Sequence, residues 1–363
     1  MNEIESAHPA MLTLARESRE MTQAELADAM AKASEEGTAV SQGYVSRAEA
    51  GRLAVTGERL DLYAAALGYP RELLCLDPQV HGVGVGLVHH RKRAALSATA
   101  LRRIHADLAL TRLQVDGLAA AAGESAVGGF PSIALDALTT PQEVAGQVRS
   151  RWGLGSGPVP DVIAVLEAGR AVVVLRDLGS DLLDAVSQWD GTMQSPLVLI
   201  NDRTPGDRCR FSLAHELGHL VMHHSPGSGP EQEKQADAFA SAFLMPAEDI
   251  RSAFMAGADL ARLADLKRHW RVSMAALLRR AKDLNAITEW QYRSSVIEMS
   301  ALGYRTAEPV SLEPERPRRL PALVKAGATR TGSPEALAAC AHLLPEDFTA
   351  RYATPPSPSK ARP

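Results

Sequence analysis

The chain has 363 residues, a length that predicts two or more domains. Hydrophobic residues make up 45% and charged residues 23% of the sequence, which is typical of a soluble globular protein. The net charge of −4 excludes a chain that is cationic throughout, so any contact with nucleic acid must come from a local patch.

Residues 9–77 predict several short helices. Thr22 and Glu25 form a capping box that marks the start of a helix in TQAELADAM. SQGYVSRAEAGR predicts another short helix that closes at Gly51, and GERLDLYAAALGY predicts a further amphipathic one. AKASEEGTA separates the first two of these helices, so either the first is longer or a loop intervenes.

These segments resemble the XRE-type helix-turn-helix of phage repressors. The resemblance implies an all-α domain over residues 1–78 that binds operator DNA, with one bracing helix and one recognition helix in the major groove. Gln and Arg read adenine and guanine edges, and other polar side chains contact the backbone. The implied contacts come from Gln23, Gln42, Gly43, Tyr44 and Arg47, and the implied core from Leu26, Val45 and Leu60. The alternative is a helical module that binds protein.

Residues 79–134 predict a helical connector. A glycine-rich stretch, HGVGVG, precedes a long helical pattern with a basic start, and GESAVGGFPS follows as a hinge. The basic cluster is interpreted as a solvated helix face or a supplementary phosphate contact, and it consists of Arg91, Lys92, Arg93, Arg102 and Arg103.

Residues 135–305 predict an α+β domain with a small three-stranded sheet. Thr140 and Glu143 form a second capping box, and a helix is predicted from about residue 161 to residue 168. AVVVL, AVSQW and PLVLIN are β-rich runs of strand length.

The stretch AHELGHLVMHH, residues 214–224, contains a candidate metal site. His215 and His219 are four residues apart, so on a helix both can face one Zn²⁺ ion. Glu216 between them would take a proton from the attacking water without being a ligand. The alternative is that the His-Glu-Leu-Gly-His pattern occurs by chance and binds no metal. His223, four residues after His219, could approach the same face, but His223 and His224 are interpreted as the polar end of the helix. Cys209 is interpreted as a buried thiol rather than a ligand of an inhibited state.

A catalytic zinc site needs a third protein ligand, and Glu233 follows His219 by fourteen residues. Asp237 lies one helical turn later on the same face, where a carboxylate can hold a ligating histidine in the required tautomer. The alternative is that both are solvated helix charges. Glu231 is a weaker candidate for the third ligand, because Gln235 occupies the position four residues after it.

RFSLAHELGHLVMHH and EKQADAFASAFLMP, preceded by PLVLIN, resemble the ImmA/IrrE family of zinc metallopeptidases. The resemblance implies a zincin-like sheet packed on helices, with zinc held by His215, His219 and Glu233, Glu216 as general base and Asp237 in support. LKRHWRVSMAALLRRAKDLNAITEWQY resembles the helical segment that follows in many members. Members typically act on a repressor protein. An exposed sheet edge beside the metal could hold an extended substrate by strand addition.

Residues 306–363 are rich in proline and arginine and predict a largely disordered tail, with a short helix at about 334–344. An odd number of cysteines, Cys75, Cys209 and Cys340, argues against a disulfide framework. The sequence has neither a signal peptide nor the ~18 apolar residues of a membrane helix, so a cytoplasmic protein without a membrane partner is expected.

The sequence therefore predicts a multidomain, mainly α regulator that binds DNA and carries a zinc metalloendopeptidase domain, which would cleave a regulatory protein such as a repressor. The alternative is a non-proteolytic repressor whose metallopeptidase-like half is a sensor or a protein-interaction module. Glu216 favours the enzyme, and fusion to a DNA-binding domain favours the regulator. Because helix-turn-helix proteins often dimerise, a homodimer is compatible with this prediction.

Overall fold

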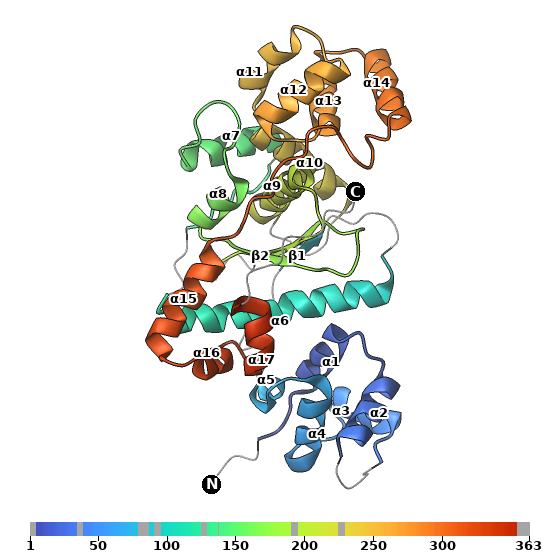
Figure 1. Cartoon of the computed structure of the whole chain (residues 1–363), viewed down its shortest axis with the longest axis vertical. Coiled ribbons are helices and arrows are strands. Elements are labelled where there is room, and N and C mark those ends of the chain that lie inside the picture. The colour runs from blue at the N-terminus through green and yellow to red at the C-terminus, as the bar shows by residue number, and fades with distance from the viewer. Residues whose placement is uncertain are drawn as a thin grey trace. The chain divides into compact units, whose positions relative to one another are not determined.

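The computed structural model describes residues 5–34, 39–78, 87–90, 96–124, 129–136, 138–189, 195–223 and 229–353. The chain divides into two compact units (Figure 1). Unit 1 comprises residues 1–86, 94–126 and 319–363, and unit 2 comprises residues 87–93 and 127–318. No helix among the described residues is long and apolar enough to cross a membrane.

Unit 1 begins with the predicted short helices, which are α1 (Pro9–Ser18), α2 (Gln23–Ala33), α3 (Gln42–Glu49), α4 (Gly57–Leu67) and α5 (Arg71–Cys75). The capping box of Thr22 and Glu25 starts α2. The predicted core residues Leu26, Val45 and Leu60 are fully buried. The expectation of an all-α helix-turn-helix domain is therefore confirmed, with α2 ending at Ala33 and α3 beginning at Gln42.

The rest of unit 1 differs from the predicted connector and tail. The long helix α6 (Ala98–Ala122) packs against α1, α15 (Arg319–Thr331) and α16 (Pro334–Cys340), so it forms the body of the unit (Figure 1). α6 and α16 approach so closely that a Cβ on Gly117 would overlap the carbonyl oxygen of Cys340. The long helix predicted for the connector is therefore present, but it is part of unit 1.

The prediction of a largely disordered tail is wrong for residues 319–353. After α16 come α17 (Pro345–Phe348) and a π-helical turn (Thr349–Ala353). Pro334 and Pro345 sit in the first turns of α16 and α17, where proline is tolerated. The prolines thus start helices instead of breaking them. Buried apolar side chains pack these helices, although the overall composition of the segment is rich in proline and arginine; they are Leu320, Leu323, Leu337 and Phe348. The predicted helix near residues 334–344 corresponds to α16.

Unit 2 contains the three predicted strands, β2 (Val172–Arg176), β3 (Ala185–Trp189) and β4 (Leu197–Asn201), after helices α7 (Pro141–Arg151) and α8 (Val162–Ala168). A fourth strand, β1 (Leu87–His90), comes from the predicted connector. The order across the sheet is β1-β3-β4-β2, with β2 parallel to β4 and β3 antiparallel to both of its neighbours. A four-residue strand between glycines and a basic run has too little periodicity to be recognised in the sequence.

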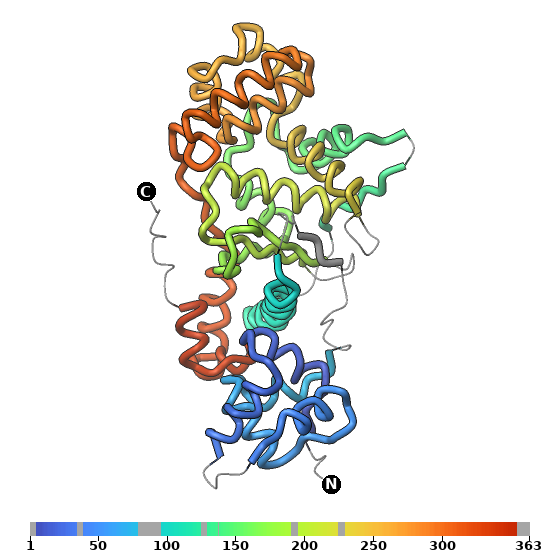
Figure 2. Tube along the Cα trace, turned by 90° about the vertical axis from the view of Figure 1, so that its right-hand side faces the viewer, coloured from blue at the N-terminus to red at the C-terminus, as the bar shows by residue number. Residues whose placement is uncertain are grey.

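Helices cover this sheet. α9 (Gly206–Met222) packs on β3 and β4 and against α10 (Pro230–Leu244), and these two helices run side by side (Figure 1 and Figure 2). The short helices α11 (Ala247–Ile250), a 3₁₀ turn (Arg251–Phe254), α12 (Leu260–Trp270), α13 (Met274–Asp283) and α14 (Glu289–Ala301) complete the unit. The core between sheet and helices includes Val198, Leu213, Leu217, Phe239 and Phe243.

Residues 305–318, named the strap here, fasten α9 to its neighbours through the buried Glu315 and the half-buried Glu308. Glu315 forms an ion pair with Arg210 of α9 and accepts the N–H groups of Val162 and Ile163 at the start of α8. Glu308 and Asp207 share Lys267 at 2.8 and 2.6 Å. Burial raises the pKa of Glu315 and lowers that of Arg210, so the structure bears the cost of desolvating both charges.

We expect Glu315→Ala to destabilise unit 2 by about 3–5 kcal/mol, because it leaves the Arg210 guanidinium buried without its carboxylate. Glu313→Ala, an exposed position on the same strap, should have little effect. All four tryptophans lie in unit 2, so urea unfolding followed by tryptophan fluorescence reports on this unit alone. Equal midpoints for the two variants would mean that the buried pair does not hold the strap.

Candidate metal centre and nucleic-acid interface

The predicted metal-site residues lie on α9 and α10, which meet at the motif itself. α9 is buried over almost its whole length. A Cβ on Gly218 would lie 3.1 Å from the ring of Phe239 on α10, closer than ordinary van der Waals contact. Glycine at this position of His-Glu-Leu-Gly-His therefore lets the second helix approach the first.

The structure brings His215, His219 and Glu233 together. The two imidazole Nε2 atoms are 3.1 Å apart, and the Glu233 carboxylate oxygens lie 3.4 Å from His215 Nε2 and 3.3 Å from His219 Nε2. Ligand atoms about 2.0–2.1 Å from a tetrahedral Zn²⁺ ion lie about 3.3 Å from one another. The three side chains thus fit three corners of a zinc tetrahedron. Within the described residues they form the one cluster of histidine, cysteine or acidic side chains placed to hold a metal ion.

The protonation states of these groups also suit a metal. Burial lowers the pKa of His219 to about 4, with a further contribution from His215, so its ring is neutral at pH 7. Burial would raise the pKa of the Glu233 carboxyl, but hydrogen bonds from His215 and His219 outweigh it and hold the pKa well below its usual range. Neutral imidazole and ionised carboxylate are the forms that ligate metals.

Each histidine is oriented by a second partner. His215 Nδ1 lies 2.9 Å from Asp237 Oδ1, so the ring donates its Nδ1 proton there and keeps the Nε2 lone pair for a metal. This is the position that the sequence predicts for Asp237.

For His219 the partner is His223, whose interpretation as a polar helix end does not hold. His219 Nδ1 lies 2.9 Å from His223 Nδ1, and His223 Nε2 lies 2.9 Å from Gln235 Oε1 on α10. The amide oxygen only accepts, so His223 donates from Nε2 and accepts at Nδ1. His219 therefore carries its proton on Nδ1, which again frees Nε2. In the sequence, Gln235 only argues against Glu231 as a ligand, and no role of its own is predicted for it. His224 lies outside the described residues.

Glu216 is fully buried, and a serine of the sheet holds its carboxylate. Ser187 of β3 donates its hydroxyl to Glu216 Oε2 at 2.5 Å. The two residues are 29 positions apart, so the sequence offers no signal for this contact.

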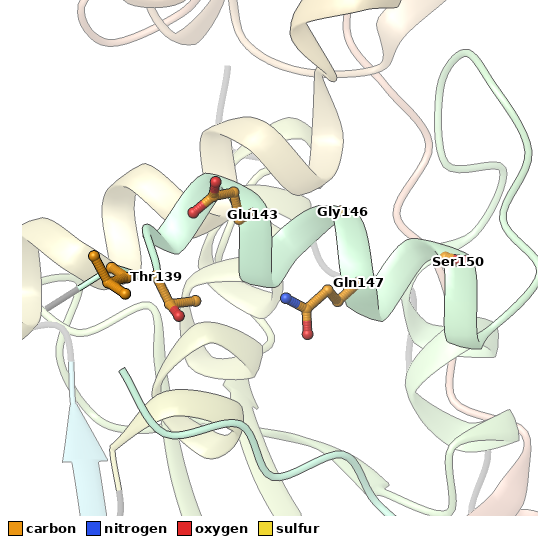
Figure 3. Close-up of a pocket in the computed structure, with 6 residues that line it drawn as sticks. Thr139, Glu143, Gly146, Gln147 and Ser150 are labelled. Carbon is orange, nitrogen blue, oxygen red and sulfur yellow. The ribbon is translucent and has the colours of Figure 1, made fainter. Parts of the chain in front are cut away.

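Two residues that the sequence analysis weighed as metal ligands lie outside the cluster of His215, His219 and Glu233. Glu231 is exposed and pairs with Lys234. Cys209 is buried, and burial raises its pKa to about 12, so it is a protonated core thiol. An open hollow elsewhere in unit 2 follows the outer face of α7 and contains none of the metal-site residues; Thr139, Glu143, Gly146, Gln147 and Ser150 line it (Figure 3). Its lining is a solvated helix face.

In unit 1 two of the predicted DNA-contact residues, Gln23 and Gln42, belong to a connected polar network. Ser41 caps α3 by accepting the N–H of Tyr44. Gln42 donates to Gln23 at 2.8 Å, and Gln23 donates to Glu49 at 3.0 Å. Gln42 is thereby held from α2 while its side chain stays exposed.

Arg16 anchors this network, which the sequence did not indicate. Its guanidinium binds both oxygens of Glu49, at 2.6 and 2.9 Å. Arg47 is exposed one turn after the half-buried Gly43. Tyr44 lies under the Arg59 guanidinium, 5.1 Å from the ring centre to the guanidinium carbon.

The predicted basic cluster is only partly described. Residues 91–93 lie outside the described residues. Arg102 and Arg103 of α6 pair with Glu17 and Glu20 at 3.6 and 3.1 Å. These two arginines therefore match the solvated helix face rather than a phosphate contact.

Comparison with known families finds two matches. Residues 12–74 match the family described as Helix-turn-helix, and residues 168–282 match the family described as IrrE N-terminal-like domain. No curated protein matches the chain. The chain thus joins an XRE-type helix-turn-helix domain to an ImmA/IrrE-like, metallopeptidase-like domain, as the motifs predict.

We expect about one zinc per chain, lost on His215→Ala, His219→Ala or Glu233→Ala and kept in Glu216→Gln, because only the first three converge on a tetrahedral centre. Asp237→Ala and His223→Ala should each weaken zinc affinity by roughly 10–100-fold, because each releases one ligating ring from its tautomer.

Metal content by mass spectrometry and affinity by chelator competition measure both effects. Glu231→Ala, two residues before Glu233 on the same helix but exposed, is the matched control. Full zinc in Glu233→Ala would remove that carboxylate from the ligand set. Unchanged affinity in His223→Ala would mean that its contact with His219 does not orient the ring.

Proposed function

From the fusion of a helix-turn-helix domain with an IrrE-like domain, we propose a DNA-binding regulator that is also a zinc-dependent endopeptidase and cleaves a regulatory protein such as a repressor. One observation carries the catalytic half of this proposal. The three ligand atoms converge with zinc spacing beside a buried glutamate that is not one of them. A purely structural metal site has no use for such a carboxylate.

The residues divide the chemistry among them. His215, His219 and Glu233 would hold the zinc ion, which when bound supplies a Lewis acid for the scissile carbonyl and lowers the pKa of water. Glu216 takes the proton of the water that adds to the carbonyl carbon. As the C–N bond breaks, Glu216 delivers that proton to the leaving amine. Ser187 keeps the carboxylate in one orientation throughout by donating to Oε2.

On the DNA side, α3 serves as the recognition helix. Gln42 and Arg47 are exposed side chains of the kinds that read adenine and guanine edges. Gln23 positions Gln42 from α2, and the Arg16–Glu49 pair positions Gln23. The network fixes the glutamine in advance, so less side-chain entropy is lost on binding.

We expect Glu216→Gln to reduce cleavage of the substrate protein by about 10²–10⁴-fold while zinc and fold are retained, because it removes the proton acceptor and little else. The substrate is found by labelling new protein N-termini in cells that carry the wild-type chain or Glu216→Gln. A cleavage that depends on Glu216 should be reproduced by the purified zinc-loaded protein.

Identical N-termini in both strains, together with DNA affinity that changes on zinc binding, would support the sensor alternative and reject the peptidase.

We expect Arg47→Ala in the full chain to cost roughly 1–3 kcal/mol on the preferred duplex and much less on random duplex, because a bidentate base contact is lost. The preferred sequence comes from selection with the wild-type protein, and affinity is measured across a salt series. Arg102→Ala is the control, since that arginine faces Glu17. An equal loss on both duplexes would make Arg47 a phosphate contact.

A further inference from the structure

We propose that strand β1 occupies the sheet edge on which a substrate peptide would bind, so that the protein closes its own active site with an internal strand. This inference rests on the proposed function, because the peptide that would compete with β1 for the sheet edge is the substrate of the proposed peptidase. Displacement of β1 would then be a condition for cleavage. The substrate class that follows is an extended protein segment recognised mainly through its backbone.

The position of β3 is the first step of the argument. β3 packs against α9, and its Ser187 donates to Glu216. β3 is thus the strand that touches the proposed general base. One edge of β3 is paired with β4. A peptide added to its other side would run past Glu216.

β1 takes that other side. It pairs antiparallel with β3 in the register Leu87 with Trp189, Val88 with Gln188, His89 with Ser187 and His90 with Val186. The backbone at residue 89 therefore lies opposite the serine that holds Glu216. β1 also lies against α9. Its place is the one that strand addition at this site would require.

The outer edge of β2 is a poorer place for a substrate. Strand β4 separates β2 from β3 in the sheet. A peptide paired with β2 would therefore lie two strands away from Ser187. Among the described strands, the β3 edge is the one beside the site.

The sequence of β1 suits a strand that exchanges. It is four residues long, and short strand pairs contribute little stability. Gly82, Gly84 and Gly86 precede it in the sequence, and glycine loses more conformational freedom on ordering than any other residue. Both properties make the form in which β1 is paired with β3 only slightly more stable than the form in which it is released. An extended segment of another protein can therefore compete with β1 for the edge of β3.

The test compares two double variants of the full chain. Val88→Pro with His89→Pro removes both N–H groups, one of which must donate to β3, because donors alternate along an antiparallel pair. Val88→Thr with His89→Thr is the matched control, since threonine keeps the N–H and favours strands. The probe is a labelled peptide of residues 84–93, GVGLVHHRKR, followed by fluorescence anisotropy.

We expect the proline variant to bind the peptide at least about tenfold more tightly than the wild type or the threonine variant, because apparent affinity falls with the fraction of molecules whose edge is open. Hydrogen exchange of residues 186–189 should be faster in the proline variant and slow again with peptide. Equal peptide binding by all three proteins, or exchange in β3 that the prolines leave unchanged, overturns the proposal.

A disulfide that holds β1 on β3 tests the same edge if the proline variant does not fold. Val88→Cys with Gln188→Cys places two cysteines at opposite residues of the pair. The oxidised protein should bind no peptide, and reduction should restore wild-type binding. Peptide binding by the oxidised protein overturns the proposal.

Cleavage separates this inference from the proposed function. Peptide binding needs neither zinc nor Glu216, so it supports the strand exchange even if no cleavage occurs, and only the peptidase proposal then fails. Cleavage by the wild type that the prolines do not accelerate overturns the strand exchange and leaves the peptidase standing. Zinc-dependent self-cleavage within residues 87–93 would make β1 a substrate and overturns its inhibitory role.

Discussion

The burial of α9 is the constraint on which unit 2 depends. A buried polar side chain is costly unless it has a partner, and α9 carries one at nearly every turn. Each partner comes from a different part of the fold. Lys267 of α12 meets Asp207, Glu315 of the strap meets Arg210, Ser187 of β3 meets Glu216, and α10 supplies Asp237 to His215. Satisfying one helix thus fixes the sheet, the second helix and the strap around it.

This arrangement makes the candidate site rigid. The histidine rings have no freedom to choose a tautomer, because Asp237 and the pair His223–Gln235 decide it from the far side of each ring. Gly218 removes the side chain that would keep α10 away. Unit 1 uses the same device at its surface, where Glu49 holds Gln23 and Gln23 holds Gln42. In both units, candidate site residues are held in place by hydrogen bonds to neighbouring side chains.

Access to the site is a separate matter from its rigidity. The groups around Glu216 are fixed by burial, whereas β1 is held by a short strand pair. Under the proposed function the protein must avoid cleaving other proteins, and an edge that is closed by its own chain would admit only segments that compete well. β1 follows the helix-turn-helix domain in the chain after eight residues, 79–86. The strand that we propose closes the site therefore lies in the link between the helix-turn-helix domain and the peptidase-like domain.

Local patterns in the sequence were enough to predict the capping boxes at Thr22 and Thr140, the three strands, the helix-turn-helix, and a His-Glu-Leu-Gly-His helix followed by Glu233 and Asp237. Their signals lie in short stretches of the chain, where spacing fixes which side chains share a face. Other features became visible only in the folded chain: the sheet order, the contact of Ser187 with Glu216, the His223–Gln235 contact, the strap and the helices after residue 319. Glu315 and Arg210 are 105 residues apart, and a carboxylate in a proline-rich segment looks like a solvated charge until folding buries it. Partnership at that distance depends on where the chain returns, which no local pattern specifies.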